Sequence, residues 1–169
     1  RQAEKQRRHE EAQLTLRRAE EAFAGVLEST DRQARRAAAS AAPDAALGAL
    51  SDTGAPLGPW AILGSDGVVL AATPPFSTDE QLVAHIARLA GRAELRAPAH
   101  AGIEDPAYSG VVSLQRFDDG RALVYGIDDA KVDAAVRKRM QTELVGDTAV
   151  RVQSKLTGGE AVPNAIDRL

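Results

Sequence analysis

Residues that could bind a metal or act as a nucleophile are few in this sequence and form no recognisable pattern. The three histidines, His9, His85 and His100, lie far apart and outside any metal-ligand spacing, and the chain has no cysteine. A zinc site needs several His, Cys or carboxylate ligands that converge on one point. A nucleophilic serine of the α/β-hydrolase type needs a Gly-x-Ser-x-Gly turn, which does not occur. We therefore predict no metal site.

Phosphate-binding loops are also missing from the sequence. Gly158-Gly159 is too short to cradle a phosphate, and neither a Walker motif nor a Rossmann fingerprint occurs. The acidic doublets Asp118-Asp119 and Asp128-Asp129 are better explained as a hairpin turn and a helix N-cap than as paired catalytic carboxylates. We predict no catalytic residues and no cofactor, and we expect this segment not to be an enzyme.

Arg116 is the polar residue whose surroundings best suggest binding chemistry. It lies in a predicted hairpin, 110–117 and 121–127, whose turn signal is Asp119-Gly120. If these two are the turn residues, Leu114 pairs with Tyr125, and one face carries Val112, Leu114, Arg116, Leu123, Tyr125 and Ile127. We prefer this two-residue turn, because a three-residue turn would mix the faces.

Two interpretations of Arg116 remain open. A planar guanidinium bordering an apolar cavity would suit the carboxylate of a small anionic ligand, and Tyr125 would add a hydroxyl. A long loop at 93–109, which contains Tyr108, would then cover the ligand. Alternatively, Arg116 extends its charge into water near the hairpin end, and Tyr125 is a core aromatic. Tyr108 and Trp60 are weaker ligand candidates.

The composition fits a globular domain and argues against several partners. The 169 residues are 44% hydrophobic and 27% charged, with a net charge of −3, so a buried core is expected and a nucleic-acid partner is not. No stretch of about 18 apolar residues occurs that would span a membrane. The first residue is Arg1 instead of Met, and we therefore expect a piece of a longer protein.

Residues 1–42 are predicted to form one long amphipathic helix, since they contain no proline and a single glycine. Leu16, Phe23, Thr30 and Ala37 recur every seven residues, and Leu27 is among the residues that fill the steps between them. This narrow stripe has two interpretations. It packs along a sheet of the same chain, or it packs against a second copy in a homodimer, with Leu16, Phe23 and Leu27 as the contact residues.

Residues 43–59 are a predicted linker, rich in Gly and Pro, with a short helix at 45–50. The remainder, 60–169, is the predicted core. It begins with a hairpin turning at Asp66-Gly67, followed by a helix that Ser77 caps with Glu80 in a capping box. A strand at 94–97 and the loop follow. After the second hairpin, Asp128 caps a helix to Val145, and a strand at 148–154 is predicted.

A helix inserted after the first hairpin of an antiparallel sheet is the plan of a PAS-like domain. With the long helix to Ala42 in front, the segments 60–71 and 111–127 resemble the Cache (PDC) family of bacterial extracytoplasmic sensor domains. The resemblance covers roughly 15–127 and implies an α+β fold, a long N-terminal helix packed on a PAS-like antiparallel sheet. The sequence departs from the family at the ligand, because the aromatic-and-Arg pattern of amino-acid-binding members is absent. The helix and strand predicted after 128 also depart from the family.

The resemblance implies a function and a location. Such domains lie outside the inner membrane and pass a signal to a histidine kinase, diguanylate cyclase or chemoreceptor output. The implied role is the periplasmic input domain of a transmembrane signalling protein that senses a small anionic ligand or a periplasmic protein. Among such proteins, a two-component histidine kinase is the expected one. The alternatives are a coiled-coil adaptor without a ligand pocket and a cytoplasmic PAS module.

Overall fold

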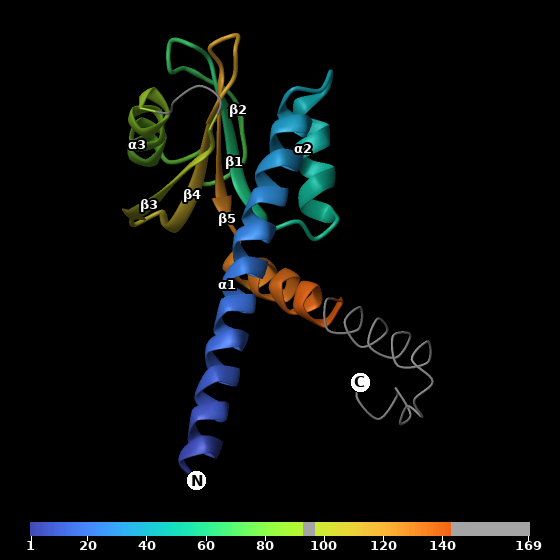
Figure 1. The fold of residues 1–169 in the computed structure, drawn as a ribbon. Coiled ribbons are helices and arrows are strands. Elements are labelled where there is room, and N and C mark those ends of the chain that lie inside the picture. Colours follow the sequence, from blue (N-terminus) through green and yellow to red (C-terminus); the bar gives the residue numbers. More distant parts are fainter. Residues whose placement is uncertain (93–96, 143–169) are drawn as a thin grey trace. The chain divides into compact units, whose positions relative to one another are not determined.

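A computed structural model describes residues 1–92 and 97–142 (Figure 1). The chain forms two compact units. One is Leu27–Val132, and the other combines Arg1–Val26 with the residues from Asp133 onward. The predicted strand at 94–97 lies almost wholly outside the described residues, and so does the predicted strand at 148–154.

Two helices precede the sheet. α1 runs from Gln2 to Ala38 and ends four residues before the predicted end at 42. α2, Pro43–Asp52, begins with a proline in its first turn, where the missing N–H needs no partner. The long helix therefore ends before Pro43, and Pro43 is the first residue of α2. α2 occupies most of the predicted linker.

The five strands of the described residues form one antiparallel sheet, which confirms the predicted α+β fold with its long N-terminal helix. The spatial order is β2-β1-β5-β4-β3, so β5 is central and β2 and β3 are the edges. The strands are β1 Leu57–Leu63, β2 Val69–Ala72, β3 Ala99–Asp105, β4 Tyr108–Arg116 and β5 Ala122–Ile127. Every residue of β5 is buried.

One face of this sheet is covered by α3, Glu80–Gly91. Leu82, Ile86 and Ala90 recur at helical spacing and are buried against the sheet. The apolar core on this side is made of these three with Ala61, Leu63, Phe76, Ile103, Val112, Leu114, Ala122 and Val124. This face is therefore filled with hydrocarbon and holds the sheet and α3 together.

The N-cap of α3 is Asp79, and the prediction of Ser77 is wrong. The Asp79 carboxylate accepts a hydrogen bond of 2.8 Å from the backbone N–H of Leu82. Thr78 and Asp79 each donate a backbone N–H to the carbonyl of Pro75, so a turn occupies the residues where the helix was expected to begin. The helix starts two residues later, where an aspartate can satisfy a free N–H.

The second hairpin has a three-residue loop, so the predicted two-residue turn is wrong. The backbone N–H of Phe117 donates to the carbonyl of Arg121 at 2.8 Å, and Asp118, Asp119 and Gly120 lie between them. Gly120 has a φ of +88°, which glycine adopts without strain. Leu114 consequently pairs with Val124 instead of Tyr125. This one-residue change places Arg116 and Tyr125 on opposite faces of the sheet.

The segment predicted as a covering loop is in large part a strand. β3 pairs along its whole length with β4, from Ala99 opposite Leu114 to Asp105 opposite Tyr108. A tight turn at Pro106-Ala107 joins them, and the Asp105 carboxylate accepts the N–H of Ala107 at 2.9 Å. Residues 99–105 are therefore part of the sheet and do not form a lid over it.

The described chain after β5 is helical from 129 to 142. The Asp128 carboxylate accepts the backbone N–H of Lys131 at 3.1 Å, which confirms Asp128 as the predicted cap. The rest of that predicted helix, up to Val145, lies outside the described residues. Within the unit that contains the start of α1, Gly25 is covered by the guanidinium of Arg139.

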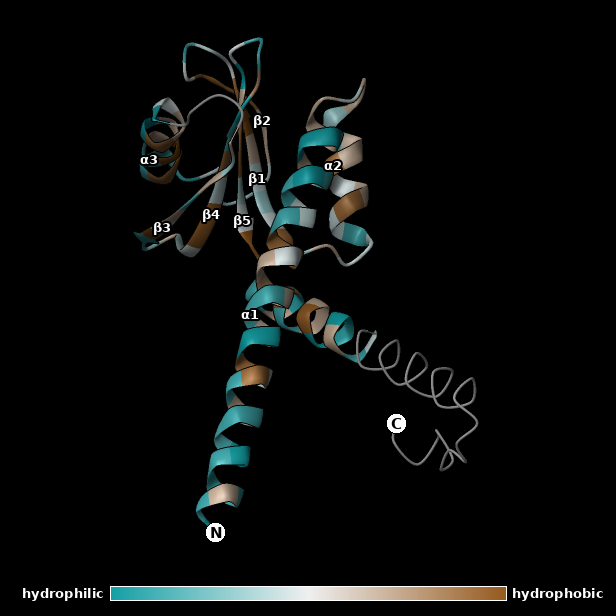
Figure 2. Ribbon diagram, in the orientation of Figure 1, coloured by the Kyte–Doolittle hydropathy of each residue, from teal (hydrophilic) through white to brown (hydrophobic). Residues whose placement is uncertain are grey.

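The exposed side chains of α1 change along its length. From Gln2 to Arg17 every residue is exposed, and Figure 2 shows this part as mostly hydrophilic. Leu14, Leu16 and Phe23 are large apolar residues that are 47%, 60% and 48% exposed. Leu27 is half-buried, while Thr30, Asp31, Ala34 and Ala38 are buried. None of the helices in the described part of the chain is both long and apolar enough to cross a bilayer.

Candidate functional site

Arg116 binds a backbone carbonyl at the C-terminal end of α3 and does not line a cavity with Tyr125. One terminal nitrogen of its guanidinium donates to the carbonyl of Gly120 at 3.0 Å, and the other donates to the carbonyl of Ala90 at 2.5 Å. Carbonyls in the last turn of a helix lack internal partners, and a cation there is favourable. The prediction that Arg116 and Tyr125 share one wall is wrong, because the loop shifts the register by one residue.

Tyr108 lies at the start of β4 and packs edge-on against Phe76, with ring centroids 5.2 Å apart. Its hydroxyl donates to the carbonyl of Val111 at 3.4 Å. Burial raises the pKa of Tyr108, and the carboxylates of Asp129 and Asp128 raise it further. The ring of Tyr108 therefore packs against side chains of the sheet and its surroundings. The predicted role of Tyr108 in ligand binding stays a prediction.

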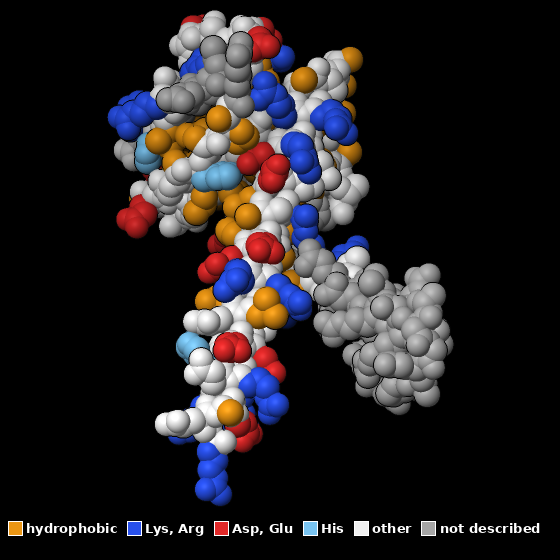
Figure 3. Space-filling model, in the orientation of Figure 1, with side chains coloured by type: hydrophobic (Ala, Val, Ile, Leu, Met, Phe, Trp, Pro, Cys, Tyr) orange, Lys and Arg blue, Asp and Glu red, His pale blue; other side chains and the backbone are white. Residues whose placement is uncertain are grey.

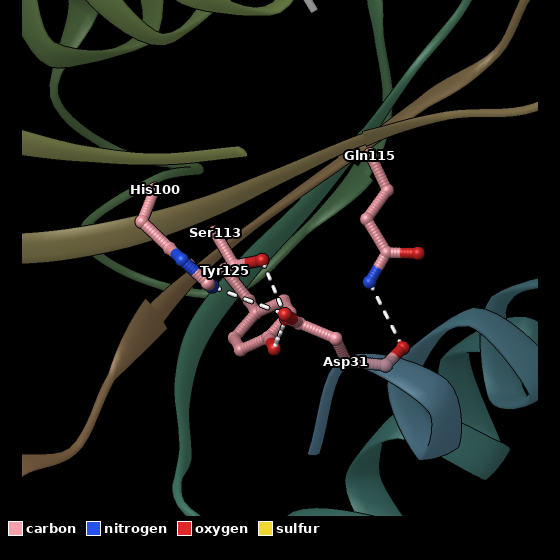
Figure 4. Close-up of polar contacts among 5 residues, drawn as sticks. All are labelled: Asp31, His100, Ser113, Gln115 and Tyr125. Carbon is pink, nitrogen blue, oxygen red and sulfur yellow. Dashed lines mark hydrogen bonds and ion pairs between the residues drawn. The ribbon is translucent and has the colours of Figure 1, made fainter. Parts of the chain in front are cut away.

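The most unusual polar arrangement in the described chain surrounds Asp31 of α1, a residue that the sequence did not single out. Only 5% of Asp31 is exposed. Three side chains donate to its carboxylate (Figure 4): Ser113 Oγ at 2.6 Å, His100 Nε2 at 3.0 Å and the hydroxyl of Tyr125. We call Asp31 with these three donors the Asp31 cluster.

The three donors come from one row across the sheet. His100 of β3 pairs with Ser113 of β4, and Ser113 pairs with Tyr125 of β5. Paired residues of antiparallel strands project from the same face, so the row presents all three to α1. Trp60 of β1, a weaker ligand candidate in the sequence, continues the row as the partner of Tyr125 and is buried.

The backbone of α1 is held at the same point. Gln115, two residues beyond Ser113 on the same face, donates its Nε2 to the backbone carbonyl of Asp31 at 2.9 Å. The side-chain oxygen of Gln115 is buried and has no hydrogen-bond partner within the described residues. Residues 27–38 of α1 are therefore attached to the sheet through both the side chain and the backbone of Asp31.

The electrostatics of the Asp31 cluster keep Tyr125 protonated. Burial raises the pKa of the Tyr125 phenol far above its usual value, and the negative charge of Asp31 raises it further. The phenol therefore remains a hydrogen-bond donor throughout the physiological range. Three donors on one carboxylate offset much of the cost of removing that charge from water.

The Asp31 cluster contains a serine, a histidine and an aspartate but is not arranged for nucleophilic catalysis. In a catalytic triad the serine donates to the histidine, which removes its proton. Here Ser113 donates directly to Asp31, and Ser113 is completely buried. The arrangement is suited to joining α1 to the sheet, and only His100 exposes a substantial part of its side chain.

The described part of Leu27–Val132 has hollows on its surface, two of which lie beside helices. One, of about 500 Å³, lies between α1 and α2 and is lined by Gln33, Arg36, Ala37, Ala46, Ala49 and Leu50, among others. The other, of about 430 Å³, lies beside the first turns of α3 and includes Gly67 and Asp79. Neither includes Arg116, Tyr125 or Tyr108, so neither matches the predicted ligand site.

Comparison with protein-family models, with curated proteins and with solved structures gives no match for this chain in any of the three. The residues and their geometry are therefore the basis for assigning a function. Among groups of His and carboxylate side chains in the described residues, none is placed to hold a metal ion.

We predict that Asp31→Asn destabilises the fold by about 2–4 kcal/mol, because the amide offers its N–H groups to donors that then lack a partner. Urea unfolding would measure this. Glu28→Gln is the matched control on the same helix, because Glu28 is exposed and pairs with Arg32 at 3.5 Å. It should change stability by less than about 0.5 kcal/mol. Equal effects of the two substitutions would contradict the role assigned to Asp31.

The raised pKa of Tyr125 predicts a specific loss of stability in alkali. Above the ordinary tyrosine pKa of 10.0 the unfolded chain loses the Tyr125 proton while the folded chain keeps it, so stability falls as pH rises through that value. The tyrosinate absorbance of Tyr125 should therefore appear only as the chain unfolds. Tyr125→Phe should remove more of the alkaline dependence than Tyr108→Phe, which changes the other of the two tyrosines. Free titration of Tyr125 in the folded chain would contradict its burial.

Proposed function

We propose that this chain is the input domain of a bacterial transmembrane signalling protein, located in the periplasm and connected to a histidine kinase or a similar output. The order of the helices and strands supports this proposal. A long helix precedes an antiparallel sheet, and α3 follows the first hairpin, as in the PAS-like and Cache domains that the sequence resembles. A similar fold does not by itself establish a function, which depends on particular residues at a site.

The observation that carries the proposal is the attachment of α1 to the centre of the sheet through the Asp31 cluster. An input domain must convert a change in its sheet into a displacement of a helix that leaves the domain. Three strands converge on one buried side chain of α1. A shift of any one strand would change the hydrogen bonds of that charge, which gives α1 a defined connection to the sheet.

The positions of Arg116 and Tyr125 in the structure bear on what the domain senses. A small anionic ligand was expected to use Arg116 and Tyr125 together, and these lie on opposite faces of the sheet. The face that carries Leu114 is filled by α3. We therefore favour a periplasmic protein partner over a small anion. A thermal-shift screen of small carboxylates and phosphate would test the choice, and a strong hit that Arg116→Ala abolishes would reverse it.

The exposed apolar residues of α1 support a homodimer as part of the proposal. Leu16 and Phe23 lie seven residues apart and are 60% and 48% exposed. Figure 3 shows isolated hydrophobic side chains among charged ones along this part of the helix. A second copy would cover them by parallel packing. The same residues favour the second candidate function, a coiled-coil adaptor that binds a protein partner and senses nothing.

Phe23→Glu should weaken self-association without unfolding the chain, because the side chain is half exposed and a charge there disfavours an apolar contact. Sedimentation velocity at several concentrations measures the association, and circular dichroism measures the fold. Val26→Glu is the contrasting variant, because Val26 is buried and its replacement should unfold the local structure. Unfolding by Phe23→Glu would contradict the dimer contact.

The full-length gene distinguishes the sensor from the adaptor. We expect hydrophobic segments, each long enough to span a membrane, on both sides of the region that encodes this chain. An alkaline phosphatase fusion placed after this region should be active only if the region is exported to the periplasm. A gene without such segments, or an inactive fusion that is stably expressed, would overturn the proposal and favour the adaptor or the cytoplasmic module.

A further inference from the structure

We propose that the Asp31 cluster is a latch set by the charge of His100, which holds residues 27–38 of α1 firmly on the sheet when the imidazole is protonated and less firmly when it is neutral. This inference rests on the proposed function, since it names how the connection between α1 and the sheet is regulated. It needs no ligand, and the isolated chain is enough to test it.

The three donors of the Asp31 cluster differ in their access to water. Ser113 is 0% exposed and Tyr125 is 1% exposed, so neither can exchange a proton with solvent while the site is closed. The side chain of His100 is 36% exposed, and within the described residues β3 is an edge strand of the sheet. His100 is therefore the one donor of the three through which the proton concentration outside can act on the buried carboxylate.

The charge on His100 changes the strength of its bond to Asp31. Imidazolium and carboxylate attract each other, and the attraction is strengthened because only 6% of the Asp31 side chain is exposed to water. Neutral imidazole can keep a hydrogen bond but brings no charge. Histidine side chains ordinarily change charge between about pH 5 and 8. Neither of the other two donors supplies a positive charge when the imidazole is neutral, because a serine hydroxyl and a protonated phenol stay neutral over this range.

Among the described side chains that contact the Asp31 carboxylate, His100 is the one ionisable base. From α1, Asp31 faces His100, and the charged neighbours Glu28 and Arg32 pair with each other at exposed positions. Arg35, one turn further along α1, places its guanidinium 5.5 Å from the centre of the Phe117 ring. From β4, the residue opposite His100 is the uncharged Ser113. From β5, Tyr125 reaches the same carboxylate as a neutral donor. The geometry therefore joins Asp31 to one imidazole and to two hydroxyl groups.

Hydrogen exchange followed by mass spectrometry tests the latch on the whole chain. Exchange of the amides in residues 27–38, corrected for its intrinsic pH dependence, should be about three- to tenfold slower near pH 5.5 than near pH 8. His100→Gln keeps a hydrogen-bond donor but cannot gain a charge, and it should remove this difference. His85→Gln is the matched control, because His85 lies on α3 at the opposite face of the sheet, and it should leave the difference unchanged.

Equal corrected exchange rates at the two pH values in the unaltered chain would overturn the latch. A pH dependence that remains in His100→Gln would overturn it as well. Should His100→Gln fail to fold, NMR of the unaltered chain replaces it. In that measurement the amide shifts of residues 27–38 must follow the titration of the His100 ring, and independent titrations would overturn the latch. These outcomes leave the membrane-topology test of the proposed function untouched, so either idea can fail without the other.

Discussion

Burial of the Asp31 charge ties residues 27–38 of α1 to three strands of the sheet. Moving a carboxylate out of water costs several kcal/mol unless donors replace the lost water molecules. Here the replacement comes from His100, Ser113 and Tyr125, one from each of three adjacent strands. The helix must therefore keep both its rotation and its position along its axis. Rotating it by the angle between two successive residues would move the carboxylate away from all three donors. A purely apolar contact would allow more sliding.

The two faces of the sheet hold their helices by different means. The α3 face uses close-packed hydrocarbon from Leu82, Ile86 and their neighbours, which is strong but not directional. The α1 face places polar groups opposite a helix whose buried residues are mostly small, such as Ala34 and Ala38. Small residues let the helix approach the sheet closely and contribute little apolar area. Directional bonds to Asp31 accordingly take a larger share of the attachment on this side.

The sequence predicted the elements better than the site, for a physical reason. Helical periodicity, Pro43 and the Asp-Gly turns are local signals, and the elements that they predict are present. The site depends on convergence of residues 69 to 94 positions apart, which only the strand register determines. Asp119-Gly120 fits both a two- and a three-residue loop, and the two differ by one residue in register. One signal was available: Asp31 follows Thr30 of the heptad stripe, on the edge of the face expected to be buried.

The loop that joins β4 and β5 therefore determines the site at a distance along the chain. Gly120 adopts a φ of +88°, and the Asp119 carboxylate accepts the backbone N–H of Arg121 at 3.0 Å, which together favour the three-residue loop. That loop places Ser113 opposite Tyr125 and so aligns two of the three donors in one row. With the two-residue turn, Tyr125 would pair with Leu114 and project into the hydrocarbon beneath α3, where a phenol would lack its acceptor. The chemistry of a surface turn thus decides whether a charge on α1 can be buried at all.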